Sequence, residues 1–340
     1  MPSKSVNLGT DFLFSKLHGR YSTALVGPRI TELIRGGSVQ ALGRALSGLG
    51  VSIQSRADVQ KNLTLAVIRE IGWLAGLVDE KTASYYRRLL DQYFLENLKT
   101  LLRFRYQRGA VEDLSFLLVQ SDYLPDIPWD RMTQARTLHE FYSLIPDTGY
   151  RRDLLPILVE VDATRDIFVA DAKIDCLYFD RLAVSADHLP RAERALAHEL
   201  TGMEVDIRNI LTAARNITVY HFSAEALGSL FLAGGRVVTK ERAIDLAGLD
   251  TEDTFWTRLP KEYAAVVEPW LRGEPYQVEN ALWSALFRKA DKSFKDFSRP
   301  ALSAVAYPFL KRFEFLNIAR LFEGLYLKLE PELIRSMMVM

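Results

Sequence analysis

The sequence predicts an all-α fold built from three related helical modules, and three observations lead to that prediction. First, Asn97, Asn209 and Asn317 each stand in a similar helical stretch, at intervals of 112 and 108 residues. Second, apolar residues recur at steps of three and four around each asparagine, as on one face of an α-helix. Third, proline and glycine punctuate the chain between these stretches. The expected modules are residues 1–110, 111–220 and 221–340.

The expected elements follow this punctuation in chain order. Each module is expected to contain an acidic helix rich in aromatic or aliphatic residues, then a polar turn, and then the asparagine helix. A second pattern, two helices joined by a Gly-Gly turn, begins at Ile30 and again at Leu227, and a degenerate third copy begins at Val111. Repeats of about 110 residues are the size of small domains rather than of solenoid units. One stretch, Ile157–Val161, is rich in β-branched residues and is an alternative short strand.

Each asparagine is predicted to point into an apolar stripe of its own helix. The residues four before and four after the asparagines lie on the same helix face. All six of these neighbours are apolar, namely Tyr93, Leu101, Val205, Ala213, Phe313 and Leu321. A buried amide is costly unless it is hydrogen-bonded, so these side chains are expected to be internal locks. The alternative is that they contact a partner protein.

Composition excludes several classes of protein. The 43 basic and 43 acidic residues cancel, so no overall charge indicates nucleic acid as a partner. The single cysteine, Cys176, excludes an internal disulfide. The N-terminal residues have no apolar core typical of a secretory signal. The longest apolar tract, Leu63–Val78, is interrupted by Arg69 and Glu70, so no membrane span is expected.

Motifs for catalysis or cofactor binding are missing from the sequence. The Gly-Gly turns lack the lysine and the spacing of a phosphate-binding loop. His198-Glu199 begins like the zinc-binding HExxH motif, but Gly202 stands where the second histidine belongs. Cys176 has no histidine nearby in the sequence, which leaves it unsupported as a nucleophile. We therefore expect no catalytic residue, no metal and no cofactor.

One segment of the first asparagine helix is strongly basic. Its cations are Arg87, Arg88, Lys99, Arg103, Arg105 and Arg108. Two interpretations remain open, a solvated helix face and a docking face for acidic loops of another protein. Nucleic acid is the weakest interpretation because no nucleic-acid-binding motif accompanies the charge.

The flanking motifs resemble a known family, that of the C subunit of V/A-type (vacuolar/archaeal-type) rotary ATPases, which is called the d subunit in eukaryotes. The C-terminal stretch AYPFLKRFEFLNIARLFEGLYLKL resembles that family's C-terminal signature, which is filled here by Tyr307, Leu310, Lys311, Glu314 and Asn317. The middle module resembles the family at Asp175, Tyr178, Leu182, Glu204, Asp206, Asn209 and Arg215. The turn at Gly234, Gly235 and Arg236 resembles the family's Gly-Gly-Arg turn.

Four departures from the family pattern indicate a divergent branch. Ala233 stands where a proline is usual, and Arg312 occupies a position that is often acidic. Phe94 lies three residues before its asparagine, where the other modules have an acid. Glu323 lies six residues after its asparagine, where the other modules have Arg103 and Arg215.

The resemblance implies a funnel-shaped, pseudo-threefold helical protein without chemistry of its own. It implies a position on the cytoplasmic side of the membrane, held peripherally by a rotary motor, between the central-shaft subunits and the membrane proteolipid ring. Besides the basic segment, the expected interface residues are Glu204, Arg208, Lys311, Glu314 and Arg320. The rival hypotheses are a free-standing helical adaptor that reuses the fold and, more weakly, an enzyme built on helices.

Overall fold

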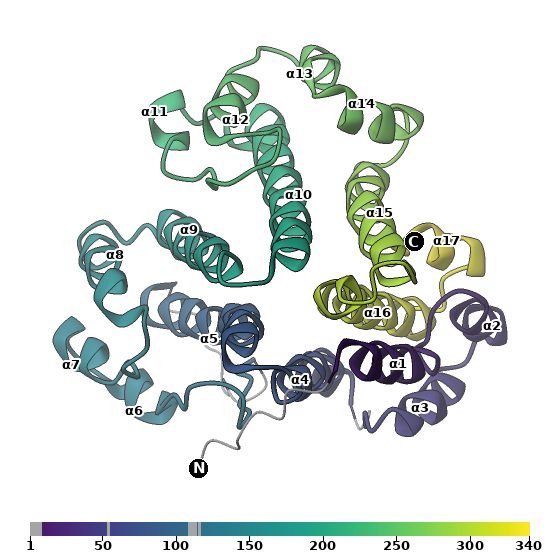
Figure 1. Cartoon of the computed structure of the whole chain (residues 1–340). Helices are drawn as coiled ribbons and strands as arrows, with labels where there is room; N and C mark the ends of the chain where they lie inside the picture. The colour runs from purple at the N-terminus through teal and green to yellow at the C-terminus, as the bar shows by residue number, and fades with distance from the viewer. Residues whose placement is uncertain (1–8, 53–54, 108–113, 115–116) are drawn as a thin grey trace.

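The computed structural model describes residues 9–52, 55–107, 114 and 117–340. Every regular element among these residues is helical, and they contain no strand (Figure 1). The all-α prediction is therefore confirmed for the described part of the chain. Arg108, one of the basic residues singled out in the sequence, lies outside the described residues.

Six long helices form a closed ring in the middle of the molecule (Figure 1). They are α4 (Arg56–Ala75), α5 (Glu80–Gln107), α9 (Ile167–Ala186), α10 (Arg191–Arg215), α15 (Pro275–Phe294) and α16 (Leu302–Tyr326). Each of them packs against the next in this order, and α16 returns to pack against α4. The asparagine helices are every second member of the ring, namely α5, α10 and α16.

Shorter helices lie outside the ring (Figure 1). They are α1 (Thr10–Tyr21), α2 (Pro28–Gly36), α3 (Val39–Gly48), α6 (Trp129–Gln134), α7 (Leu138–Ser143), α8 (Arg151–Thr164), α11 (Ala224–Leu227), α12 (Lys240–Ala247), α13 (Glu252–Arg258), α14 (Lys261–Val267) and α17 (Pro331–Ser336). A π-helical turn, η2 (Asn216–Tyr220), extends α10, and a 3₁₀ turn, η3 (Glu268–Trp270), follows α14. Helix α12 packs on α10, and α8 packs on α9.

Helices from the beginning and the end of the chain pack together on the outside of the ring. Helices α1, α2 and α3 all pack against α16, and α2 also packs against α17. The first helices in the sequence thus cover the last long helix. The three module boundaries expected from the sequence stay a prediction.

The alternative strand at Ile157–Val161 is wrong, because these residues lie inside α8. The buried residues of α8 are Leu154, Ile157, Leu158 and Val161, which follow a helical spacing of three, one and three residues. They pack onto the neighbouring α9, so burial of one helix face outweighs the local preference of β-branched residues for strands.

Every second interface of the ring carries an ion pair at the same position. The pairs join the residue six after each asparagine to the start of the next long helix: Arg103 to Asp171 (3.0 Å between Nε and Oδ2), Arg215 to Glu279 (3.2 Å) and Glu323 to Arg56 (2.6 Å). The third pair has the opposite polarity. Glu323, noted in the sequence as a departure, is therefore matched by a cation where the other interfaces have an acid.

The reversed pair works against the helix dipoles. Arg215, in the last turn of α10, meets a favourable partial charge. Glu323 and Arg56 meet unfavourable ones at the corresponding places. Both side chains are about half exposed, at 43% and 51%, so solvent screens their interaction.

We predict that the third interface depends on opposite charges but not on their polarity. Glu323→Arg alone places like charges together and is expected to lower the free energy of unfolding slightly, because solvent screens this exposed pair. The double variant Arg56→Glu with Glu323→Arg should recover this loss and gain a little from the helix dipoles. Urea unfolding of both single variants and the double variant at low salt measures the coupling. Strictly additive changes would contradict the ion pair.

Candidate functional site

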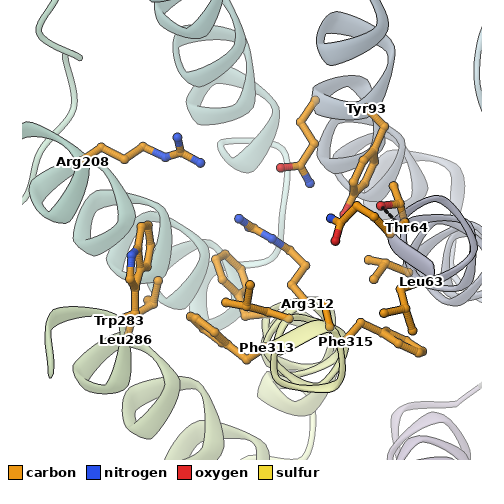
Figure 2. A pocket seen from close by; sticks show the side chains of 15 residues that line it. Leu63, Thr64, Tyr93, Arg208, Trp283, Leu286, Arg312, Phe313 and Phe315 are labelled. Carbon is orange, nitrogen blue, oxygen red and sulfur yellow. Dashed lines mark hydrogen bonds between the residues drawn. The ribbon is translucent and has the colours of Figure 1, made fainter. Parts of the chain in front are cut away.

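A cavity of about 280 Å³ lies where five of the six ring helices meet (Figure 2). Its wall on α15 and α16 is largely aromatic and includes Trp283 and Phe313, whose ring centres lie 6.4 Å apart. The facing wall on α4 and α5 is more polar and includes Thr64 and Tyr93. Two guanidinium groups, those of Arg208 and Arg312, extend toward the middle of the view. A concave site with an apolar wall and a few polar groups is typical of a binding site.

A bidentate ion pair crosses the ring beside this cavity. Arg312 on α16 donates from Nη1 to Oε2 of Glu204 on α10 at 2.9 Å, and from Nη2 to Oε1 at 2.8 Å. Arg208, one turn after Glu204 on the same helix, donates to Oε1 from Nη2 at 3.1 Å. Glu204 is buried, and its two partners are partly exposed. The departure at Arg312 therefore has a physical counterpart, a buried acid on the opposite helix.

Electrostatics keeps this cluster charged. Burial alone raises the pKa of Glu204, but Arg312 and then Arg208 outweigh it and hold the pKa at about 2, below the ordinary 4.5. Although burial lowers the pKa of Arg312, the Glu204 carboxylate outweighs that effect and raises it above the ordinary value. One carboxylate and two guanidinium groups thus leave the cluster with one net positive charge.

The three asparagines make the same contact. In each case the side-chain oxygen accepts a backbone N–H, and the side-chain nitrogen donates to the carbonyl of that same residue: Val119 for Asn97, Leu232 for Asn209 and Val339 for Asn317. The bonded residue lies 22 or 23 positions after the asparagine. All three amides are buried. They bind the irregular segment that follows, rather than the side chain of a neighbouring helix.

The residue three before the asparagine also holds backbone in two of the modules. Asp206 accepts from the backbone N–H of Val238 at 2.8 Å, and Glu314 accepts from that of Leu25 at 2.9 Å. A Cβ added to Gly235 would lie 2.2 Å from the Val238 carbonyl oxygen and 2.7 Å from Asp206 Oδ1. Glycine is therefore required in this Gly-Gly-Arg turn by close packing.

The described members of the basic segment mostly have partners within the chain. Arg87 pairs with Glu80, Arg88 with Asp91 at 2.6 Å, and Arg103 with Asp171. Lys99 is buried and contacts Asp175 at 2.8 Å, while Arg105 donates to the Ala135 carbonyl at 2.6 Å. A docking face built from these residues stays a prediction, and it has few unpaired cations to offer.

The remaining expected interface residues lie close to the asparagine helix α16. Lys311 and Glu314 are both buried and form an ion pair with each other. Arg320 donates to Oδ1 of Asn280 at 2.9 Å and to the Met337 carbonyl. Of the expected set, the structure brings Arg208 to the central cavity, with its partner Glu204 beside the cavity, and it places Lys311, Glu314 and Arg320 among internal contacts.

The sequence did not predict a second charged network, formed by the partly buried Glu70. Its carboxylate accepts from Arg20 Nε at 2.7 Å and from the Tyr307 hydroxyl at 2.5 Å, which joins α1, α4 and α16. Arg20 and Tyr307 hold the pKa of Glu70 below its ordinary value, against the effect of burial. A charged residue interrupting the apolar tract Leu63–Val78 was the available signal.

The described residues give little support to a metal site or a reactive cysteine. They contain no group of three or more His, Cys, Asp or Glu side chains placed to hold a metal ion. Burial raises the pKa of Cys176 to about 11, which leaves the thiol protonated near neutrality. His198 contacts Asp187 at 2.9 Å. None of the described helices has the length and apolarity that a membrane crossing requires.

We predict that Asn209→Ala lowers stability before it alters partner binding. The change leaves the buried N–H of Leu232 and the carbonyls of Leu232 and Val238 without their bonds, at a cost of about 1–3 kcal/mol. Asn97→Ala, which breaks two partly buried bonds instead of three buried ones, is the milder comparison. Urea unfolding measures both. Weakened partner binding at unchanged stability would contradict the structural role.

We also predict an acid-sensitive component of stability at Glu204. In the folded protein the pKa of Glu204 is depressed to about 2. The contribution of ionised Glu204 to the free energy of unfolding is therefore complete above pH 4.5 and is lost as the pH falls toward 2. The shift corresponds to about 3 kcal/mol. Glu204→Gln should therefore reduce stability strongly at pH 7 and far less at pH 3. Glu323→Gln, at the exposed pair, is the matched control. Parallel stability curves for wild type and Glu204→Gln across this range would refute the prediction.

Comparison with known proteins identifies the family. The profile of the ATP synthase (C/AC39) subunit family matches residues 15–337. The C subunit of the A-type ATP synthase of Haloferax volcanii is 25% identical over 88% of this chain and 84% of its own length, and that of Methanocaldococcus jannaschii is 21% identical over 92% and 81%. The match to the Methanosphaera stadtmanae protein of the same name, 21% identical, covers 58% of this chain and about half (51%) of that relative. This chain belongs to the ATP synthase (C/AC39) subunit family.

Proposed function

We propose that the protein is the non-catalytic central-stalk subunit of a V/A-type ATPase or ATP synthase. In this role it links the rotary shaft to the membrane proteolipid ring and transmits torque coupled to ion translocation. The observation that carries the proposal is the central cavity, lined by five of the six helices of a closed ring, in a chain of this family. The cavity is the seat proposed for the end of the shaft.

The construction of the ring supports a mechanical role. A coupling element must resist twisting, and each long helix here is packed against two others. Ion pairs join each asparagine helix to the long helix that follows it in the ring, and the pair of Glu204 with Arg312 crosses between α10 and α16. A load applied at the centre is thereby shared by helices from all three parts of the chain. In the complete assembly these parts form the pseudo-threefold funnel.

The membrane contact is proposed to pass through partners. No described helix is suited to crossing a bilayer, so attachment on the cytoplasmic side requires the proteolipid subunits. Partners on both sides, the shaft at the cavity and the proteolipid ring at the other face, distinguish this role from that of a free-standing adaptor. An adaptor would have no motor subunits among its stable partners.

Co-purification tests the proposed function. The tag belongs at the N-terminus, because Val339 near the other end is bonded to Asn317. Affinity purification of the tagged protein from detergent-solubilised membranes should recover the shaft and proteolipid subunits with it. Asn97→Ala should not change the yield of these subunits. Recovery of the chain alone, from cells shown to hold an assembled motor, would favour the adaptor and count against the proposal.

A further inference from the structure

The size of the central cavity limits what can enter it. The cavity holds about 280 Å³. A space of this size accommodates a few side chains from the tip of a partner helix.

The walls select the chemistry of those side chains. Of the 15 residues that line the cavity, the charged ones are Arg208 and Arg312, and none is acidic (Figure 2). Phe309, Phe313 and Trp283 supply an aromatic wall, and the Arg312 guanidinium lies over the Phe309 ring at 5.6 Å. The surroundings thus suit a group that combines an apolar body with a negative charge.

Of the two cations that line the cavity, Arg208 is the one with a terminal nitrogen that donates no hydrogen bond to a described residue. Arg312 uses both ends of its planar group on the two oxygens of Glu204. Arg208 contacts one of those oxygens, at 3.4 Å from Nε and 3.1 Å from Nη2, and its guanidinium lies 5.3 Å from the centre of the Phe179 ring. Among the described residues nothing accepts a hydrogen bond from its Nη1, and its side chain is 38% exposed. An arginine can donate five N–H bonds, so a second carboxylate can bind without displacing Glu204.

We infer that the cavity receives a carboxylate together with an adjacent apolar side chain from the tip of the shaft, and that Arg208 binds the carboxylate. This inference rests on the proposed function, because it takes the shaft as the occupant. The aromatic wall then contacts the apolar side chain, and the single excess positive charge of the cluster is neutralised on docking. A shaft tip with a basic group at the same place would be rejected by the two guanidinium groups.

Small probes of the isolated protein test the chemistry of the cavity. The probes are 3-phenylpropionate and 3-phenylpropan-1-ol, which share the apolar body and differ in charge. Titration followed by NMR should show that the wild type binds the carboxylate about tenfold more tightly, as expected for a charge-assisted bond to arginine. Arg208→Gln should remove that preference and leave the affinity for the alcohol unchanged. Arg215→Gln, on the same helix but paired with Glu279 and absent from the cavity lining, should change neither affinity.

The outcomes separate this inference from the proposed function. Equal affinity for the two probes, failure of both to bind at millimolar concentration, or a parallel loss of both in Arg208→Gln would overturn the inference. In a further outcome, the protein discriminates between the probes but recovers no motor subunits on co-purification. That result would refute the proposed function and the shaft as occupant, while the preference for a carboxylate stands. Recovery of motor subunits without discrimination would overturn the inference alone.

Discussion

Closure of the helix ring is the constraint on which the rest of the structure depends. A six-membered ring closes only if every long helix offers one edge to the helix before it and another to the helix after it. The last edge, between α16 and α4, joins segments that are far apart in the sequence, and α1, α2 and α3 support it from outside. Once the ring is closed, its inner side chains share one small space. The cavity and the cluster around Glu204 are consequences of that geometry.

The buried polar groups of this ring fix the relative positions of its helices as well as stabilising them. Removing Glu204 and Arg312 from water costs free energy, which the attraction between Glu204 and its two guanidinium partners offsets. An apolar pair of similar size would stabilise α10 against α16 as well, but it would tolerate many relative positions. The bidentate pair tolerates few, and each asparagine does the same for the segment that follows its helix. A protein under torque requires helices whose relative positions are fixed in this way.

Much of the fold could be predicted from the sequence, because the relevant signals are local. Helical periodicity and the recurring asparagines indicate the α5, α10 and α16 helices, and glycine and proline indicate many of the turns. The pairing of helices could not be predicted in this way. Arg56 meets Glu323 across 267 positions, and Arg312 meets Glu204 across 108. The sequence around Arg56 and Glu204 does not identify these pairings. Arg312 and Glu323, however, were visible as departures from the family pattern. Each of these two departures has a charged partner that only three-dimensional proximity reveals.

The basic segment shows that a run of like charge in the sequence does not by itself indicate a surface that is free to bind a partner. Arg88, Lys99 and Arg103 each meet a carboxylate within the chain, and the buried Lys99 pairs with two acids. Charge that is neutralised internally has little left for a partner, because a new contact must first break an existing one. Arg208 differs in that no described residue accepts a hydrogen bond from its Nη1. The capacity of a side chain to bind a partner thus depends on its unsatisfied donors rather than on local charge density, and at the centre of this ring that criterion selects Arg208.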